Sequence, residues 1–497
     1  MTSVAFLFAA SRAIGGGHAM RCLTLARALA AQGARVLLAC PEGTAEAVPA
    51  LGRSRLPLVA VAVAGQGAFP PAQAFGNALG HVDVAVVDSY ALDATFHRAC
   101  RAWAGRVMVI DELADRAYDA NLLADFTPGR GPDAFDGLLP PAATVALGPA
   151  YAPLRPAFAE GRRRSLMERA GRKGQIGRLV ITPGLVDAPN LAAAVLDGLE
   201  REGFRGTVDI LLGSAAPHRD AIAARLRPGW HLHVDTDDVA GLLAQADLAI
   251  GTGGMSSWER CALGLPTLLL VGAENQRANA AALAALGAAL VLDGPDLPTS
   301  VATGLAALQA DPAAVEGLSA AAALACDGLG ANRLAGLLLP TRTPAGKPVT
   351  LRPVGEGDVE LMFRWQSDPV TRRYARNPDP PSWDGHVAWC RRRLSDPLCL
   401  FNIVELDGVP AGVARLDPLP DGDDSHEVSI LTAPGAHGQG VGKAALQALR
   451  RLVPHADIFA AVLPGNEASR RLFHSAGYQP APGGFRSPPA PVIPELS

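Results

Sequence analysis

Charged and aromatic residues are scarce in this 497-residue chain, at 19% and 5% of the sequence. No long block of lysine and arginine stands out, and the formal net charge is only −4, which argues against a nucleic-acid partner. The apolar fraction of 49% nevertheless supplies material for real hydrophobic cores. The composition is therefore that of a globular protein, not of a disordered or fibrous one.

Cysteine is also scarce and never occurs in a C-x-x-C spacing. The seven cysteines are scattered along the chain, at Cys22, Cys40, Cys100, Cys261, Cys326, Cys390 and Cys399. This pattern argues against a zinc ribbon or a disulfide framework and predicts a reducing, cytoplasmic compartment. No cluster of aspartate and histidine demands a metal ion, so we expect no metal to be required.

Long hydrophobic runs are missing too. The longest, residues 280–292, is mostly alanine, whereas a membrane span needs roughly 18 apolar residues. The apolar N-terminal stretch has no basic segment before it and leads into a glycine loop, so we interpret it as a first strand and not as a signal peptide. We therefore expect no membrane partner.

At roughly 150 residues per domain, the length predicts about three domains. Short, largely apolar runs, typical of strands covered on both faces of a parallel sheet, predict strands at residues 4–10, 34–40, 82–88, 106–111, 178–184, 208–213, 247–251 and 266–271. The more polar stretch 231–236 is predicted to be a further strand of the second series. Helical patterns such as 19–31 and 94–103 lie between them. We predict two Rossmann-like lobes, residues 1–160 and 161–340, with the Arg- and Gly-rich stretch 155–177 as the crossing linker.

A Pro/Gly/Thr stretch at 341–348 predicts a linker, and the sequence changes in character after it. Tryptophan becomes denser, and basic residues cluster at Arg372, Arg373 and Arg376. We expect a third domain over residues 349–480, followed by a flexible, Pro-rich tail at 481–497.

A glycine loop follows the first expected strand, in S-R-A-I-G-G-G-H-A-M-R-C. Gly15, Gly16 and Gly17 let the backbone approach a ligand, and the next helix points its N-terminal amides at the same place, which is typical of an anion or sugar-nucleotide site. His18 lies at the helix start, where the helix dipole favours the neutral, basic imidazole. The alternative is a capping or surface histidine.

Two further strands of the first lobe end in polar residues, at Asp88-Ser89-Tyr90 and at Asp111-Glu112. Residues at the carboxyl ends of parallel strands line the crevice of an open α/β sheet. Each of these two strand ends could equally cap a helix or form a turn.

The most informative stretch of the second lobe is G-T-G-G-M-S-S-W-E-R-C-A-L-G-L-P. Gly253 and Gly254 open a loop before Ser256, and Glu259 falls in the first turn of a helix, where a carboxylate can accept both hydroxyls of a ribose. Glu259 as a helix stabiliser is the alternative. Asn275 and Gln276 offer uncharged donors to a diphosphate or sugar, with helix capping as the alternative.

The segments IGGGHAMRCLTLARAL, VVDSYALD, VIDELADRAYDANLL, LGPAYAPLRPAF and GTGGMSSWERCALGLPTLLL…AENQ resemble the UDP-sugar hydrolases of pseudaminic acid biosynthesis, over about residues 1–340. That family is built like GT-B glycosyltransferases and cleaves UDP from UDP-2,4-diacetamido-2,4,6-trideoxy-β-L-altropyranose. The resemblance implies that His18 is the base that activates water. It also implies substrate contacts from Gly16, Gly17, Arg21, Tyr90, Gly184, Gly254, Ser256, Glu259, Asn275 and Gln276. One departure is Gly184-Leu185, where the family usually has two successive glycines.

In the third domain, a strand at 427–431 precedes a glycine run that could cradle a pyrophosphate with backbone amides. Together with NEASRRLFHSAGY at 466–478, this run resembles the GNAT acetyltransferases over about 349–480, and TLRPVGEGDVELMFRWQSDPVTRRYARNP resembles their amino-sugar branch. The resemblance implies acetyl-CoA as co-substrate. The residues implied to bind it are Gly438, Gly440, Gly442, Lys443 and Asn466.

The chain departs from the GNAT pattern at two positions. His437 stands at the first place of the Q/R-x-x-G-x-G/A signature, and Phe473 stands where a tyrosine acid is often found. Glu427 or His426 could relay the acceptor proton, with strand-edge polar residues as the alternative.

The sequence thus predicts a fused bifunctional α/β enzyme with two Rossmann-like lobes of GT-B type followed by a GNAT α/β domain. We expect the GNAT domain to acetylate the 4-amino group of a UDP-linked 4-amino-4,6-dideoxy sugar. The lobes would then hydrolyse the product to UDP and free sugar. Two alternatives are a GT-B glycosyltransferase with a fused acetyltransferase, and a non-catalytic nucleotide-sugar sensor.

Overall fold

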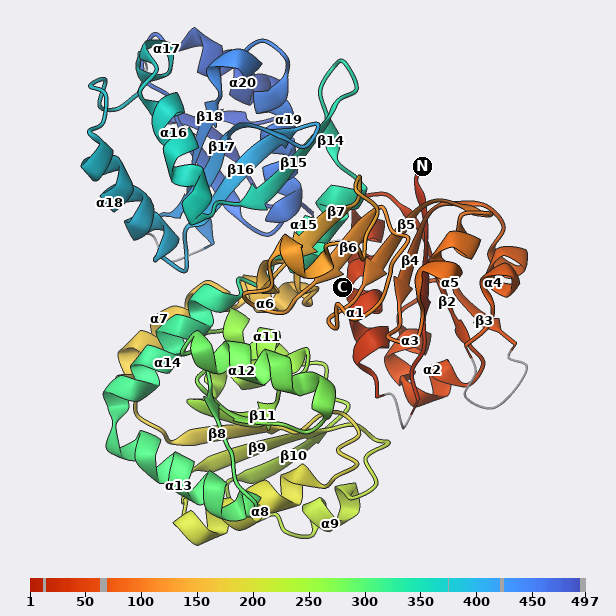
Figure 1. The fold of residues 1–497 in the computed structure, drawn as a ribbon. Helices are drawn as coiled ribbons and strands as arrows, with labels where there is room; N and C mark the ends of the chain where they lie inside the picture. Colours follow the sequence, from red (N-terminus) through yellow and green to blue (C-terminus); the bar gives the residue numbers. More distant parts are fainter. Residues whose placement is uncertain (12–14, 63–68, 374, 421–423, 492–497) are drawn as a thin grey trace. The chain divides into compact units, whose positions relative to one another are not determined.

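The computed structural model describes residues 1–11, 15–62, 69–373, 375–420 and 424–491 (Figure 1). The chain divides into two compact units, and the second begins at Asn332. The first unit contains two parallel sheets, which define a first and a second lobe. Each unit is considered by itself below.

The first lobe is built on seven parallel strands in the order β3-β2-β1-β4-β5-β6-β7. The strands are β1 (Ser3–Phe8), β2 (Arg35–Pro41), β3 (Leu58–Val61), β4 (Val82–Asp88), β5 (Ala104–Ile110), β6 (Leu122–Asp125) and β7 (Thr144–Leu147). The helices are α1 (Gly17–Ala31), α2 (Thr44–Ala47), α3 (Pro49–Arg53), α4 (Ala72–Leu79) and α5 (Ala94–Cys100), with 3₁₀ turns η1 (Pro132–Phe135) and η2 (Pro149–Tyr151). The core of β1 is buried on both faces, as its continuous apolar run predicts.

The second lobe has six parallel strands in the order β10-β9-β8-β11-β12-β13. They are β8 (Arg178–Thr182), β9 (Thr207–Leu212), β10 (Trp230–Val234), β11 (Leu248–Thr252), β12 (Thr267–Leu270) and β13 (Leu290–Val291). The helices are α6 (Pro156–Glu160), α7 (Arg162–Arg172), α8 (Leu191–Glu202), α9 (Arg219–Ala223), α10 (Val239–Gln245), α11 (Ser256–Ala262), α12 (Arg277–Ala285), α13 (Leu297–Ala310) and α14 (Pro312–Ala325), with η3 (Glu274–Gln276). Helices α11 and α12 lie on one face of this sheet and α8 on the other (Figure 1).

The second unit is built on an eight-stranded sheet in the order β14-β15-β16-β17-β18-β19-β21-β20. Its strands are β14 (Thr341–Arg342), β15 (Pro348–Pro353), β16 (Leu400–Leu406), β17 (Val409–Pro418), β18 (Ser425–Thr432), β19 (Asp457–Ala461), β20 (Gln479–Ala481) and β21 (Gly484–Ser487). Its helices are α15 (Gly330–Leu338), α16 (Val359–Gln366), α17 (Pro369–Arg372), α18 (Trp383–Leu394), α19 (Val441–Leu452) and α20 (Glu467–Ser475), with η4 (Glu356–Asp358) and η5 (Pro434–Ala436). Neighbouring strands are antiparallel except for β18 and β19. The predicted fold class, two Rossmann-like sheets followed by a smaller α/β domain, is confirmed.

The stretch 155–177 is not the expected linker, because most of it forms α6 and α7. Its arginines are buried instead of solvated. Arg162 donates to the carbonyl oxygen of Ala262 at 2.6 Å, and Arg169 donates to that of Ala246 at 2.6 Å. These carbonyls lie at the ends of α11 and α10, so each guanidinium satisfies backbone groups that a helix leaves without partners. The arginines therefore attach α7 to the second lobe.

The stretch 341–348 is not an extended linker either. Thr341 and Arg342 form β14, which pairs with β15 in an antiparallel hairpin. The hydroxyl of Thr341 also donates to the carbonyl oxygen of Ala444 in α19 at 2.9 Å. Two residues of strand are too short to show an alternating pattern, so the sequence carried no signal for β14.

The expected Pro-rich tail begins later than residue 481. Residues 484–487 form β21, which pairs with β19 in the sheet interior, and the amide of Ala490 donates to the carbonyl oxygen of Pro454 at 2.8 Å. Residues 492–497 lie outside the described part of the chain.

One described segment, 312–338, is long and apolar enough to cross a membrane by length and hydropathy alone, which the search for apolar runs missed. It comprises α14 and α15, with non-helical residues at 326–329 between them. Val315, Ala322 and Ala323 of α14 are buried, so part of the segment serves as core.

Candidate functional site

In the first lobe, His18 and Asp88 meet at the point where the strand order reverses. His18 follows β1 at the start of α1, and Asp88 ends the neighbouring strand β4. The His18 Nδ1 lies 2.6 Å from the Asp88 Oδ1, and the His18 side chain is 12% exposed. Because a carboxylate only accepts hydrogen bonds, Nδ1 carries the proton and Nε2 is left as the basic nitrogen. This arrangement orients an imidazole for proton abstraction.

Arg21 ties two carboxylates into the same cluster. It donates to Asp88 through Nε and Nη2 at 2.7 and 2.6 Å, and to Glu112 through Nη1 at 2.6 Å. Burial alone would lower the pKa of Arg21, but Asp88, Tyr90 and Glu112 raise it well above its ordinary value. Burial likewise opposes ionisation of Asp88, yet Arg21 and His18 hold its pKa well below its usual range. Both groups therefore remain charged although they are buried.

Tyr90 completes the cluster. Its hydroxyl donates to the Glu112 Oε2 at 2.7 Å, and its ring meets that of His18 edge-on with 4.7 Å between centroids. Burial and the Glu112 carboxylate both raise the pKa of Tyr90, so the phenol stays protonated. The structure thus brings His18, Arg21 and Tyr90 together with Asp88 and Glu112, which come from the two polar strand ends singled out in the sequence.

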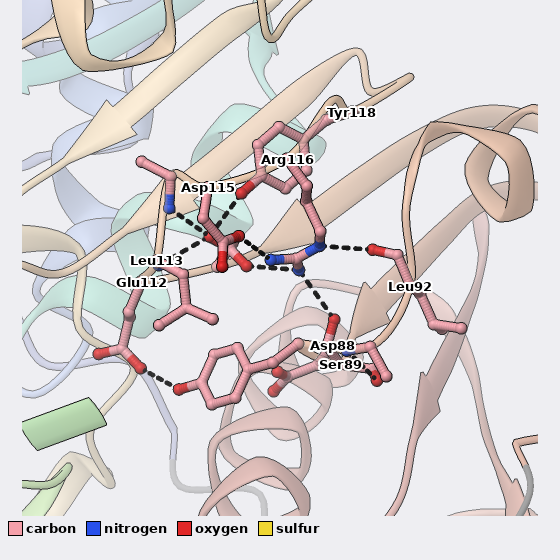
Figure 2. Close-up of polar contacts among 12 residues, drawn as sticks. Asp88, Ser89, Leu92, Glu112, Leu113, Asp115, Arg116 and Tyr118 are labelled. Atoms are coloured by element: carbon pink, nitrogen blue, oxygen red, sulfur yellow. Dashed lines mark hydrogen bonds and ion pairs between the residues drawn. The ribbon is translucent and has the colours of Figure 1, made fainter. Parts of the chain in front are cut away.

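The second polar strand end, at Asp111, forms a separate cluster. The Asp111 Oδ2 accepts from the amides of Leu113 and Ala114 at 2.8 and 3.0 Å and from the Tyr118 hydroxyl at 2.7 Å. Asp111 also pairs with Arg116 at 2.5 Å. Figure 2 shows Arg116 donating to the carbonyl oxygens of Leu92 and Ser89. Asp111 is therefore a turn former, one of the two roles left open for it.

In the second lobe, the loop after β11 is covered by Gln276. A Cβ on Gly253 would lie 3.3 Å from the Cβ of Gln276, and one on Gly254 would lie 3.8 Å from its Nε2. The Gln276 Oε1 also accepts from the amide of Gly272 at 3.1 Å. Gly253, Gly254 and Gln276 are thus neighbours, whereas the side chain of Asn275 lies outside the described residues.

Glu259 lies in α11 and pairs with Arg155. The Arg155 Nη2 is 3.3 Å from the Glu259 Oε1, and the Glu259 side chain is 21% exposed. A ribose that bound to Glu259 would therefore share its carboxylate with a guanidinium.

The loop after β8 contains Gly184, for which the resemblance implies a substrate contact, and Asp187. Gly184 is exposed, with φ of 109°, but the carboxylate of Asp187 accepts from the amides of Leu191 and Ala192 at 2.8 and 3.0 Å. Asp187 therefore occupies amides at the start of α8 that an anion would otherwise use. This occupation is in line with the departure from the family pattern at Gly184-Leu185.

In the second unit, β18 and β19 diverge. They pair in parallel only as far as Glu427 and Phe459, although β18 continues to Thr432. The backbone edge of β18 beyond Glu427 is therefore not paired with β19. The strand leads through η5 into the glycine run.

In the glycine run, Gly440 directly precedes the first residue of α19, and Gly442 lies within that helix. Gly438 and Gly440 have φ of 75° and 81°, a region that favours glycine. A Cβ on Gly438 would meet no atom within 4 Å, but one on Gly440 would lie 2.5 Å from the Cδ of Pro344. The β14–β15 hairpin therefore lies against the start of α19.

The other expected acetyl-CoA contacts have different surroundings. Lys443 is exposed on α19, whereas the Asn466 Oδ1 accepts from the amide of Ser469 at 3.0 Å and caps α20. A Cβ added to Gly442 would lie 3.3 Å from the side chain of Leu472.

Two positions of this unit bear on proton transfer. Glu427 forms an ion pair with Arg376. Phe473 is buried and packs against Tyr478, with 5.3 Å between ring centroids.

Sequence reasoning missed one charged residue close to the predicted site, Arg260. It is 1% exposed and bridges the ends of β8 and β11 through Thr182 and Thr252. The available signal was an arginine three and four residues after Ser257 and Ser256, on the same side of α11. Among the described residues, no group of three or more His, Cys, Asp or Glu side chains is placed to hold a metal ion.

Comparison with known families assigns two parts of the chain. Residues 349–479 match the acetyltransferase (GNAT) domain, and residues 227–331 match the glycosyltransferase family 28 C-terminal domain. The chain thus combines a glycosyltransferase-like part with an acetyltransferase domain.

Among individual proteins, the chain is similar to the spore coat polysaccharide biosynthesis protein SpsG of Bacillus subtilis (strain 168), with 34% identity over 149 residues. The match covers 29% of this chain and only 42% of SpsG. The crystal structure of Acinetobacter baumannii MurG aligns with a TM-score of 0.48 and 17% identity, over 68% of this chain and 99% of MurG. The structure of AAC(6')-Ib in complex with ribostamycin and coenzyme A aligns with a TM-score of 0.25 and 20% identity, over 28% of this chain and 89% of the other.

Proposed function

We propose that the chain is a bifunctional nucleotide-sugar enzyme. The GNAT domain acetylates the 4-amino group of a UDP-4-amino-4,6-dideoxy sugar, and the lobes hydrolyse the resulting UDP-2,4-diacetamido-2,4,6-trideoxy-β-L-altropyranose. The observation that carries the hydrolytic half is the His18–Asp88 pair at 2.6 Å, in a cluster with Arg21, Tyr90 and Glu112. The acetyltransferase half rests on the GNAT match of residues 349–479.

In the hydrolytic step, the His18 Nε2 takes a proton from water as the water oxygen bonds to the anomeric carbon. The bond between that carbon and the UDP oxygen breaks, and UDP leaves as an anion. Asp88 holds the imidazole orientation through Nδ1 and stabilises the imidazolium that forms. A diphosphate is already a good leaving group, so this step does not require a general acid.

The second lobe supplies the recognition of UDP. Ser256 and Gln276 lie around the Gly253-Gly254 loop and offer a hydroxyl and an amide to the ligand. Glu259 accepts the ribose hydroxyls beside Arg155. The family 28 match covers this loop and α11, which supports a nucleotide-sugar ligand at this place.

In acetyl transfer, the sugar amine attacks the thioester carbonyl, the carbon–sulfur bond breaks, and the coenzyme A thiolate takes up a proton from water. The amides from Gly438 to Gly442 hold the pyrophosphate, and Gly438 has room for it because no atom lies within 4 Å of its Cβ position. Glu427 is the acceptor for the amine proton. It forms an ion pair with Arg376.

Incubation with the acetylated UDP-sugar alone tests the hydrolytic half. We expect UDP and free sugar in equal amounts without any added acceptor. Release of UDP only in the presence of a sugar or protein acceptor would identify a glycosyltransferase. Binding without release under either condition would identify a nucleotide-sugar sensor.

A further inference from the structure

Arg260 places a buried positive charge where the strand order of the second sheet reverses. Its Nη1 donates to the Thr182 Oγ1 at 2.7 Å, and its Nη2 donates to the carbonyl oxygen of Thr252 at 2.8 Å. These two residues end β8 and β11, the neighbouring strands between which the order changes direction. Ligands of open α/β sheets bind outside the carboxyl ends of such strands.

The charge of Arg260 lacks a direct acidic partner among the described residues. Its other contacts are the hydroxyl oxygens of Ser256 and Ser257, at 3.2 and 3.0 Å, and both are uncharged. Glu259 attracts it electrostatically, but that carboxylate forms its ion pair with Arg155. Burial lowers the pKa of Arg260 to about 10, so the guanidinium remains charged at neutral pH. A buried charge without a counter-charge is costly, and a bound anion would supply the counter-charge.

The hydrogen bonds also fix which way the hydroxyl protons point. A hydroxyl that accepts from a guanidinium must donate its own proton elsewhere. Ser257 donates to the carbonyl oxygen of Thr252 at 3.3 Å. Ser256 is partly exposed and has no such acceptor among the described residues, so its proton is available to a ligand.

Gly251 makes room for this arrangement. A Cβ at that position would lie 2.1 Å from the Thr182 Oγ1 and 2.7 Å from the Arg260 Nη1. The approach of Arg260 to the strand ends therefore requires glycine here. A side chain that only tied β8 to β11 would not need to carry a charge.

We propose that Arg260 is a positioning residue for a diphosphate. Arg260 orients the Ser256 hydroxyl toward the diphosphate, and the diphosphate supplies the negative charge that balances Arg260. The inference rests on the proposed function only in the choice of a nucleoside diphosphate as ligand. It assigns no bond-breaking step to Arg260.

Calorimetric titration of the full chain with UDP, uridine and inorganic pyrophosphate tests the proposal. We expect the wild-type chain to bind UDP more tightly than uridine, and pyrophosphate to compete with UDP. In Arg260→Met, which keeps the length of the side chain, UDP affinity should fall about 10- to 100-fold, the range of a charged hydrogen bond. Uridine affinity should stay the same, and the ligand-free melting temperature should stay the same or rise.

If Arg260→Met does not fold, Ser256→Ala provides a second test, because Ser256 is partly exposed and its replacement should not prevent folding. It should weaken UDP binding and leave uridine binding unchanged. Equal weakening of UDP and uridine in these variants, or wild-type affinities for UDP and uridine that are alike, would overturn the proposal. If the binding differences hold but no UDP-sugar is hydrolysed, the proposed function fails and the role of Arg260 stands.

Discussion

Replacing Asp88 with asparagine tests the arrangement around His18 directly. The substitution keeps the size of the side chain but removes the carboxylate that accepts from the His18 Nδ1 at 2.6 Å and from Arg21 at 2.6 and 2.7 Å. The amide can also turn its NH₂ group toward His18, which would favour the wrong tautomer. Both effects change the hydrogen bond at Nδ1, and thereby the orientation and tautomer of the ring on which the basic Nε2 depends.

The expected magnitudes follow from burial and from the partner that remains. Removing one member of a buried ion pair costs about 3–5 kcal/mol. Arg21 keeps its bond to Glu112 at 2.6 Å, so we expect a loss of stability at the lower end, about 3 kcal/mol. Release of UDP from the acetylated UDP-sugar should fall about 10²- to 10⁴-fold, the usual share of a general base.

Asp111→Asn is the matched control. Asp111 is as buried as Asp88, directly follows β5, the neighbour of β4, and pairs with Arg116 at 2.5 Å without contacting His18. It should lower the melting temperature but leave UDP release per folded molecule unchanged. Both variants are assayed for UDP release at saturating substrate and for melting. Near-normal UDP release from folded Asp88→Asn would refute the reasoning about the imidazole.

Three further predictions concern other parts of the chain. Glu259→Ala should raise KM for the UDP-sugar more than it lowers kcat, because the carboxylate binds the ground and transition states alike; an unchanged KM with a lower melting temperature would favour the helix-stabiliser role. Gly440→Ala should destabilise the second unit by about 1–3 kcal/mol, because φ of Gly440 is 81° and the new Cβ would lie 2.5 Å from Pro344. Adding Pro344→Ala should restore part of this stability when the melting of the double variant is measured. Burial lowers the pKa of His97 to about 4, below the ordinary value of about 6.5, so the stability that neutral His97 contributes is full above pH ~6.5 and is lost as the pH falls toward 4. The melting temperature of His97→Phe should therefore fall less between pH 7 and pH 5 than that of the wild type. An equal fall in both proteins would contradict this.

The strands of both lobes were predictable where a continuous apolar run is buried on both faces, as in β1 and β4. The shorter strands β3, β6, β7 and β13 were missed, since four or two residues carry little pattern. Composition also misled where the Arg- and Gly-rich stretch 155–177 was taken for a linker. In α7, Arg162 and Arg169 are buried because they bind carbonyl oxygens at helix ends.

The candidate sites were predictable as single residues but not as partners. The glycine loop pointed to His18, yet its pairing with Asp88 depends on β1 and β4 lying side by side, and their sequence separation hides this. Arg260 escaped notice for a similar reason, because its partners Thr182 and Thr252 come from different strands. The contact of Pro344 with Gly440 depends on the β14–β15 hairpin, which was taken for a linker.

The order of the two reactions is the central claim, and one measurement tests it most directly. The intact chain is given the UDP-linked 4-amino sugar with and without acetyl-CoA, and UDP release is followed in water with no other acceptor. The account predicts rapid UDP release only when acetyl-CoA is present, preceded by the acetylated UDP-sugar as an intermediate. Equal release of UDP without acetyl-CoA, or acetylation without any UDP release, would contradict it.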